Sequence, residues 1–278
     1  MTEPKILPIP EFESVGIGDI KFCLAHSKRR TSNMSPGIDP IHIHSYTEIF
    51  VNIDSDVSFL VENRLYPLSR GDVIISPPGA SHVCIFNRDT VHDHACIWID
   101  AERGSYLTKF IDEEGFSPLI TFGDGAEKFL ELVAELEAST VEDCSELSRA
   151  ATLLNILSML ETASGTHQSE HHLPAAMQAI LDDIHENCMQ IKSVNDIIDR
   201  NFISGATLNR YFRKYIHLSP REYLESQKLS YATRLLLSGD TVTDCCMKAG
   251  FSDCSHFISL FKKKFGTTPF KYKQSARL

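Results

Sequence analysis

The chain has 278 residues, a length typical of two domains. Its hydrophobic fraction of 42% and charged fraction of 23% are those of a globular protein and exclude a largely disordered chain. No apolar run approaches the ~20 residues that span a bilayer, and the N-terminus lacks the pattern of a secretion signal. We therefore expect a cytoplasmic protein with no membrane partner.

The net charge of −10 is distributed unevenly along the chain. Residues 1–172 contain 12 Lys and Arg against 27 Asp and Glu, whereas residues 192–278 contain 15 against 7, a net charge of +8. This asymmetry favours a nucleic-acid-binding module at the basic end, joined to an acidic domain of a different kind. Eight scattered cysteines without a Cys-x-x-Cys pair predict reduced thiols and no disulfide framework.

Short strands separated by turns are predicted over residues 41–100. The stretch from Ile41 to Ile53 alternates with period two, and β-rich segments follow at 57–62, 73–76, 83–87 and 94–100. Many short strands of this kind predict a β-sandwich or small barrel. Residues 28–30 form a basic triplet that we expect in a polar loop. We expect His92 and His94 to lie on a strand edge that is exposed to solvent.

Polar side chains gather on one face of the first predicted strand. Alternate residues of a strand point the same way, so His42, His44, Tyr46 and Glu48 share a face. His82 ends a Gly-x5-Pro-x-Gly-x-x-His run that begins at Gly71. Imidazoles with one carboxylate suit Fe, Mn, Zn or Ni. Either His42, His44, Glu48 and His82 hold a divalent metal, or these residues and Tyr46 line an effector pocket that requires no cofactor.

These residues resemble two motifs of the cupin superfamily, His-x-His-x3-Glu and Gly-x5-Pro-x-Gly-x2-His. In metal-binding cupins the three His and one Glu converge on one ion inside a β-barrel. One departure is that the Asn which often closes the second motif falls at Phe86, with Asn87 one residue later. The resemblance implies a cupin-like effector-binding barrel over residues 1–125.

Helical periodicity begins at Ala126. Residues 126–138 and 142–162 carry apolar residues at helical spacing, and the second segment has two apolar stripes. We expect one stripe to pack on the barrel and the other on a second copy, which makes residues 126–163 a helical dimerisation segment. The alternative is that both stripes face one core. Residues 164–173 are polar, small and aperiodic, and predict a linker.

Residues 174–278 predict a succession of helices. A short helix, a tight turn and a longer helix occur at about 193–215 and again at about 241–265, which is the helix-turn-helix plan. A helix of about 18 residues, opened by the capping box at 219–222, joins the two units. The predicted N-caps are Ser193, Ser204, Ser219 and Thr241.

The outward faces of the two longer helices are polar or basic. Arg pairs with guanine and Asn with adenine in the major groove, and Lys or Arg binds phosphates. An all-α bundle with a solvated basic face is the alternative to DNA binding. The candidate DNA contacts are Ala206, Asn209, Arg210, Arg213 and Lys214 on the first helix, and Cys254, Ser255, His256, Ser259, Lys262 and Lys263 on the second.

The stretch from Gly250 to Tyr272 resembles the signature of the AraC/XylS transcription regulators. It keeps Gly-Phe-x-Asp-x-Ser-x-Phe, then Phe-Lys and Gly-x-x-Pro. The first unit is looser: His217 stands where the family usually has Gly before Ser-Pro, and residues 195–200 lack the usual Leu-Ala. A cupin-like effector domain is common in this family, so the resemblance spans most of the chain.

The sequence therefore predicts a two-domain protein. An N-terminal all-β cupin-like barrel is followed by a helical dimerisation segment and a C-terminal all-α tandem helix-turn-helix domain. The resemblance implies a transcription regulator that is not an enzyme and binds operator DNA as a homodimer under the control of a small-molecule effector. RNA polymerase is a further partner if the protein is an activator. The alternative is a metal-dependent cupin dioxygenase or isomerase tethered to DNA.

Overall fold

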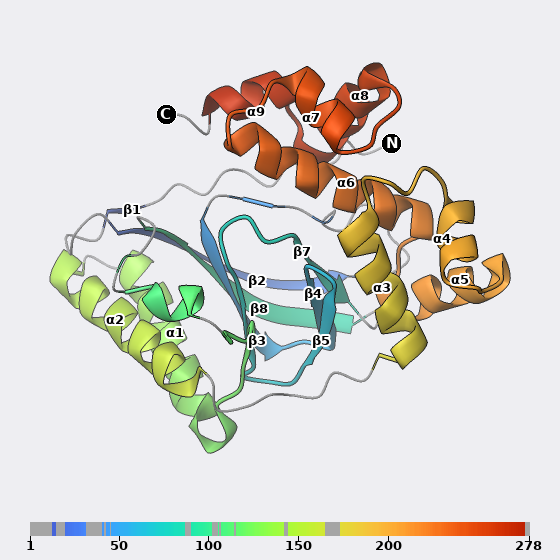
Figure 1. Cartoon of the computed structure of the whole chain (residues 1–278). Helices are drawn as coiled ribbons and strands as arrows, with labels where there is room; N and C mark the ends of the chain where they lie inside the picture. Colours follow the sequence, from blue (N-terminus) through green and yellow to red (C-terminus); the bar gives the residue numbers. More distant parts are fainter. Residues whose placement is uncertain are drawn as a thin grey trace.

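A computed structural model describes residues 13–14, 20–31, 41, 43–44, 46–86, 90–101, 105, 107–113, 115–141, 144–164 and 173–275. Strands form the N-terminal part of the chain, and helices follow (Figure 1). Across these ranges, none of the helices combines the length and the apolar character that crossing a membrane requires.

Two antiparallel sheets form the N-terminal part (Figure 1). The larger, in the order β1-β2-β8-β3-β6-β9, contains β1 (Glu13–Ser14), β2 (Lys21–Thr31), β8 (Thr90–Asp100), β3 (Thr47–Asp54), β6 (Val73–Ser76) and β9 (Leu119–Ile120). The smaller, in the order β5-β4-β7, contains β5 (Arg64–Leu68), β4 (Val57–Val61) and β7 (His82–Phe86).

A buried apolar cluster fills the space between the sheets. Phe50 and Ile74 of the larger sheet pack with Phe59 and Phe86 of the smaller, because alternate residues of each strand point to one face. The predicted fold class, a β domain followed by a helical domain, is confirmed. Among the described strands no ladder joins the two sheets, so these strands do not close a barrel, although two facing sheets are compatible with the predicted cupin-like domain.

Helices α1 (Ala126–Val141) and α2 (Glu146–Ala163) cover the other face of the larger sheet (Figure 1). Both apolar stripes of α2 enter this core, Ala150 and Leu157 from one and Ile156 from the other. The stripe expected on a partner subunit is therefore largely buried within the chain, although Leu147 at the start of α2 is 75% exposed. The homodimer stays a prediction.

The C-terminal helices are α3 (Ala175–Asn187), α4 (Val194–Arg200), α5 (Gly205–Tyr211), α6 (Pro220–Leu237), α7 (Val242–Lys248), α8 (Cys254–Phe265) and α9 (Pro269–Ser275). Short helical turns are η1 (Lys109–Asp112), η2 (Gly123–Gly125) and the π turn η3 (Phe212–Ile216). All four predicted N-caps are confirmed, because each side chain accepts a hydrogen bond from a backbone N–H of the first turn. Helix α9 was not predicted.

The helical part does not have a core entirely of its own. Leu60, Val83 and Ile85 on the outer face of the smaller sheet belong to the same buried cluster as Ile180 and Ile184 of α3. This cluster continues into α4 and α5. A separate cluster joins α6, α7 and α8 around the second helix-turn-helix unit. One continuous apolar cluster therefore connects the smaller sheet, α3 and the first helix-turn-helix unit.

Gly250 lies where the turn of the second unit approaches the turn that follows α3. Its φ is +75°, and a Cβ at this position would collide with the backbone carbonyl of Met189. Lys228 Nζ of α6 donates a hydrogen bond to the Gly250 carbonyl oxygen over 2.8 Å. Only glycine fits both the conformation and the space. The close approach fixes how the two units sit relative to each other.

Several local predictions in the β domain are wrong. The strand predicted from Ile41 is β3, which begins at Thr47, and residues 28–30 belong to strand β2 instead of a loop. Lys28 Nζ donates to Asp93 Oδ2 of β8 over 2.7 Å. His92 and His94 are buried, with rings packed on Phe86 and Phe50, and do not form a solvated edge.

The prediction that all cysteines are thiols is also wrong, because Cys246 and Cys254 form a disulfide. The turn between α7 and α8 folds the chain back, which brings their Cα atoms to 5.8 Å. That separation is within the range of ~4.4–6.8 Å that disulfides occupy. Spacing along the sequence did not reveal the pair, because the proximity comes from the crossing of two helices.

Candidate nucleic-acid interface and candidate effector site

Helices α5 and α8 each follow a short helix and a tight turn, as the helix-turn-helix plan requires (Figure 1). Their apolar sides are buried, with Leu208 in one and Phe257 and Phe261 in the other. Amphipathic spacing therefore turns the opposite sides outward. Ten of the eleven candidate DNA contacts are exposed: Ala206, Asn209, Arg210, Arg213, Lys214, Ser255, His256, Ser259, Lys262 and Lys263.

Cys254 is the exception among these candidates. It is half-buried at the first position of α8, and its sulfur is bonded to Cys246 of α7. The side chain is directed towards the preceding helix, so the structure gives it a role other than reading a base.

Aromatic rings support two of the cations on the first unit. The Arg210 guanidinium carbon lies 5.9 Å from the centre of the Tyr211 ring, and Lys214 Nζ lies 4.9 Å from that of Tyr215. Such cation–π contacts restrict long side chains while leaving their donors available. Asn209 Nδ2 donates to the Gly205 carbonyl oxygen over 2.8 Å, so this amide would have to turn outward to meet a base.

The first recognition helix ends in the π turn η3 and then at His217, whose φ is +59°. The backbone N–H of His217 donates to the Phe212 carbonyl oxygen over 2.8 Å. This is the left-handed termination for which glycine is usually selected. The structure thus explains the departure from the family pattern: His217 adopts the conformation that the usual glycine provides. Burial lowers the pKa of its imidazole.

Three of the four predicted metal ligands converge in the β domain. His44, Glu48 and His82 are all buried, and one ligand atom from each lies within 4.8 Å of the others. His44 Nε2 is 3.2 Å and His82 Nε2 is 3.5 Å from Glu48 Oε2. Trp98 Nε1 donates to the same oxygen over 2.8 Å. His42, the fourth predicted ligand, lies outside the described residues.

Hydrogen bonds orient both imidazoles of this cluster. His44 Nδ1 lies 2.8 Å from the Tyr46 carbonyl oxygen, and His82 Nδ1 lies 2.9 Å from that of Ala80. A carbonyl only accepts, so each Nδ1 carries a proton and each Nε2 faces Glu48. An Nε2 that also carries a proton can donate to the carboxylate, and an Nε2 that does not can share a metal ion with it. Backbone carbonyls orient metal-binding histidines in the same way.

Tyr46 lies beside the cluster and stacks on His44, with ring centroids 3.8 Å apart. Burial raises the pKa of its phenol, which therefore stays neutral. Tyr46 therefore packs directly against the cluster, and its place in an effector pocket stays a prediction.

Contacts run from this cluster to the helical part of the chain. Ser81, next to His82, donates its backbone N–H to Glu62 Oε1 over 2.9 Å. Glu62 in the β4–β5 turn faces two helices: its Oε2 lies 3.4 Å from His185 Nδ1 of α3, and its Oε1 lies 3.9 Å from an Arg234 nitrogen of α6. On the other side, Tyr272 Oη of α9 donates to the Ile43 carbonyl oxygen over 3.4 Å.

A second group of contacts joins the same turn to α3. Asn63 Nδ2 donates to Asp182 Oδ1 over 2.5 Å, and Gln178 Nε2 donates to the Asn63 carbonyl oxygen over 2.9 Å. Arg64 lies 3.7 Å from the Asp182 carboxylate. The turn is therefore a polar junction between the sheet that carries His82 and α3, the helix that precedes the first helix-turn-helix unit.

Comparison with known proteins matches residues 198–275 to a helix-turn-helix domain family. An uncharacterized HTH-type transcriptional regulator of Bacillus subtilis strain 168, YfiF, is 25% identical over 242 residues, covering 82% of this chain and 77% of the relative. The HTH-type transcriptional activator RhaS of Escherichia fergusonii is 27% identical over 146 residues, 52% of each chain. The structure of ToxT from Vibrio cholerae aligns with 90% of this chain and 98% of that chain at 15% identity and a TM-score of 0.38.

Proposed function

Because the chain belongs to the AraC/XylS family of transcription regulators, we propose that it binds a specific double-stranded operator with α5 and α8 as its recognition helices. One observation carries the proposal: the same helix-turn-helix unit occurs twice, with an exposed polar and basic face each time. Both units lie in the part of the chain that carries a net charge of +8 over residues 192–278. Lys and Arg in such numbers favour association with phosphates.

The length of α6 supports simultaneous binding by both units. This helix has 18 residues and joins the first unit to the second. At 1.5 Å per residue it is ~27 Å long. With the bodies of the two units added, the recognition helices come near the ~34 Å that separates successive turns of the major groove. One chain can then contact two grooves on one side of the duplex.

Roles within the interface follow from side-chain chemistry. We assign base recognition to Arg210 and Asn209, whose donors suit guanine and adenine. Ser255, His256 and Ser259 lie in the first two turns of α8, where a recognition helix reaches base edges. Arg213, Lys214, Lys262 and Lys263 lie further along their helices and suit phosphate contacts.

We further propose that the cluster of His44, Glu48 and His82, together with Tyr46, is the effector site. The donor set fits a divalent metal, since two imidazole nitrogens and one carboxylate are a common set for Fe, Mn, Zn or Ni. A bound metal would supply positive charge between the two Nε2 lone pairs and the carboxylate. An acidic small molecule bound to the protonated histidines would satisfy the same groups.

The contacts of Glu62 offer a route from this site to DNA. A ligand that moves His82 moves Ser81, which is hydrogen-bonded to Glu62. Glu62 in turn faces His185 and Arg234 on two helices of the DNA-binding part. A ligand can shift the equilibrium between two orientations of these helices only by the difference between its binding free energies for the two. We expect that preference to act through the β4–β5 turn.

We propose a regulator and not an enzyme, which the names of its relatives support. We also propose a cytoplasmic homodimer, with RNA polymerase as a partner if the protein activates transcription. In a dimer, four recognition helices would face the operator. The exposed Leu147 and the half-buried Leu154 of α2 would be the starting point of the interface.

Selection of duplexes from a random-sequence pool by the full-length protein, followed by gel-shift titration, tests the DNA-binding proposal. Specific regulators bind their sites ~10³–10⁷ times more tightly than random DNA. We expect selection to converge on one sequence with a preference in this range. Equal affinity for the selected and random duplexes would contradict the proposal, and metal-dependent turnover without DNA selectivity would favour the tethered enzyme.

A further inference from the structure

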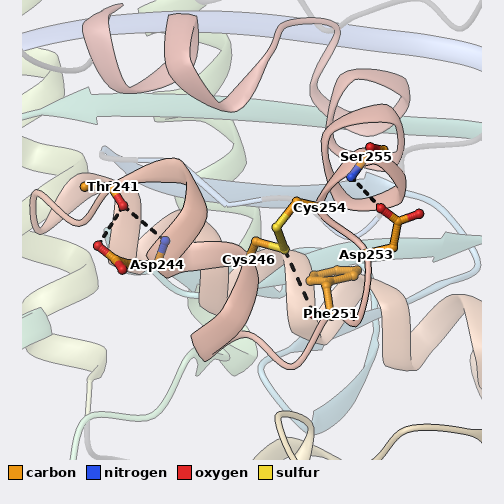
Figure 2. The surroundings of a disulfide bond; sticks show 7 residues. All are labelled: Thr241, Asp244, Cys246, Phe251, Asp253, Cys254 and Ser255. Carbon is orange, nitrogen blue, oxygen red and sulfur yellow. Dashed lines mark hydrogen bonds between the residues drawn. A yellow bond between two sulfur atoms is a disulfide. The ribbon is translucent and has the colours of Figure 1, made fainter.

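The turn of the second helix-turn-helix unit contains a disulfide that the proposed function does not use. Figure 2 shows Cys246 of α7 bonded to Cys254, the first residue of α8. The two residues differ in their access to solvent. Cys246 is fully buried in the cluster that includes Phe257 and Phe261, whereas Cys254 is half-buried at the end of α8 that leads into the candidate interface.

We propose that Cys246 and Cys254 form a reversible thiol–disulfide site that makes operator affinity depend on the redox state of the cell. The proposal rests on the proposed function. A protein that binds a bacterial chromosome works where thiols are kept reduced, and disulfides found there are mostly transient, catalytic or redox-sensing. A disulfide inside a DNA-binding unit is therefore a candidate for redox control of DNA binding, and not only a structural link.

The surroundings of the pair accommodate both redox states. Cys246 Sγ lies 4.0 Å from the Phe251 carbonyl oxygen, so a thiol at this position has an acceptor for its proton (Figure 2). Cys254 opens a helix of 12 residues, where unpaired backbone N–H groups favour a thiolate. The carboxylate of Asp253 beside it already accepts from the backbone N–H of Ser255 over 2.8 Å. Cys254 is thus the more accessible and more reactive of the two sulfurs.

The oxidation can proceed by exchange with a low-molecular-weight disulfide such as oxidised glutathione. The Cys254 thiolate attacks one sulfur, breaks that disulfide and releases one thiol, which leaves a mixed disulfide on Cys254. The Cys246 thiol loses its proton and attacks the Cys254 sulfur, which forms the internal bond and releases the second thiol. Two protein thiols are oxidised and one small disulfide is reduced to two thiols.

The bond acts on the part of α8 that would contact base edges. Cys254 immediately precedes Ser255 and His256, both exposed candidate contacts. In the disulfide form these residues are tied to α7, whose own start is fixed by the Thr241 cap on Asp244 (Figure 2). In the dithiol form the first turn of α8 keeps the Asp253 cap and the buried Phe257, but loses its covalent link to α7. We expect reduction to weaken operator binding about tenfold, which corresponds to ~1.4 kcal/mol.

Two measurements on the full-length protein test this proposal. The first is differential alkylation with mass mapping after equilibration in oxidised or reduced glutathione, which needs no DNA. We expect the peptides of Cys246 and Cys254 to be linked in the first buffer and alkylated in the second. Cys245, a buried thiol next to the pair, should never be linked and serves as an internal control. Alkylation of both Cys246 and Cys254 in oxidised buffer would overturn the redox site.

The second measurement is operator binding by gel shift in the same two buffers. Wild type should bind about tenfold more tightly when oxidised, whereas Cys254→Ser and Cys246→Ser should bind equally in both buffers. Cys144→Ser, outside the helical part that binds DNA, should keep the full redox dependence. Equal binding by oxidised and reduced wild type would overturn the proposal that the disulfide controls operator affinity. Absence of specific binding in both buffers would instead overturn the proposed function, whatever the mapping shows.

Discussion

Replacing Gly250 by alanine tests how the two helix-turn-helix units are held together. The φ of +75° places an alanine in the left-handed region, which costs about 1–2 kcal/mol. The new Cβ would also collide with the Met189 carbonyl, a backbone group that cannot turn away. Forcing an extra carbon into a packed site costs a further ~1–3 kcal/mol. We therefore expect Gly250→Ala to lose about 2–5 kcal/mol of unfolding free energy.

Gly79→Ala is the matched control. Gly79 has a φ of +83°, but a Cβ at this position would have no described atom within 4 Å beyond its chain neighbours, so only the conformational cost of about 1–2 kcal/mol applies. Urea unfolding of both variants, followed by circular dichroism, gives the two losses. Gly250→Ala should also weaken operator binding in gel shifts, because the turn of the second unit must move. Equal loss of stability in the two variants would refute the close approach of Gly250 to Met189.

Three further predictions follow from the remaining contacts. Arg210→Ala should lose ~1–3 kcal/mol on the operator and relax selectivity at one position, whereas Lys263→Ala should weaken binding to all duplexes and reduce the salt slope by about one unit, both by gel shift. If the effector site holds a metal, His44→Ala should abolish stoichiometric metal in elemental analysis and lower the melting temperature; unchanged metal content would exclude this site. The Asp93 hydrogen bond raises the pKa of His26, so its stabilisation is complete below pH ~6.5 and is lost as the pH rises through the folded-state pKa. The melting temperature of His26→Gln should accordingly fall furthest below wild type near pH 6 and least at pH 8.5, and the opposite trend would exclude a charged His26.

The helical part was predictable because its signals are local. Each N-cap serine or threonine lies within a few residues of the N–H group that it accepts from, so the sequence alone places the start of the helix. Gly266, with a φ of +69°, ends α8 in the same local way. The packing of α3 on the smaller sheet was not predictable, since Val83 and Ile180 are almost a hundred positions apart and no local pattern connects them.

In the β domain the sequence motifs identified which residues come together in the site, but not the backbone conformation of each of these residues. His44, Glu48 and His82 do come together, as the resemblance to cupins implied. However, His44 precedes β3, so the alternation that placed it on a strand was wrong about its conformation. His92 and His94 were expected to be solvated because they are polar, but Phe86 of the opposite sheet packs on His92 and Phe50 of the neighbouring strand packs on His94.

Hydroxyl-radical footprinting of the full-length protein on its selected operator tests most directly whether two units of one chain read one site. For each protein chain, we expect two protected patches on the same side of the duplex, about one helical turn apart. Substitution of Arg210 should weaken protection at one patch, and substitution of Lys263 at the other. A single protected patch, or protection that does not depend on sequence, would contradict the reading of one site by two units.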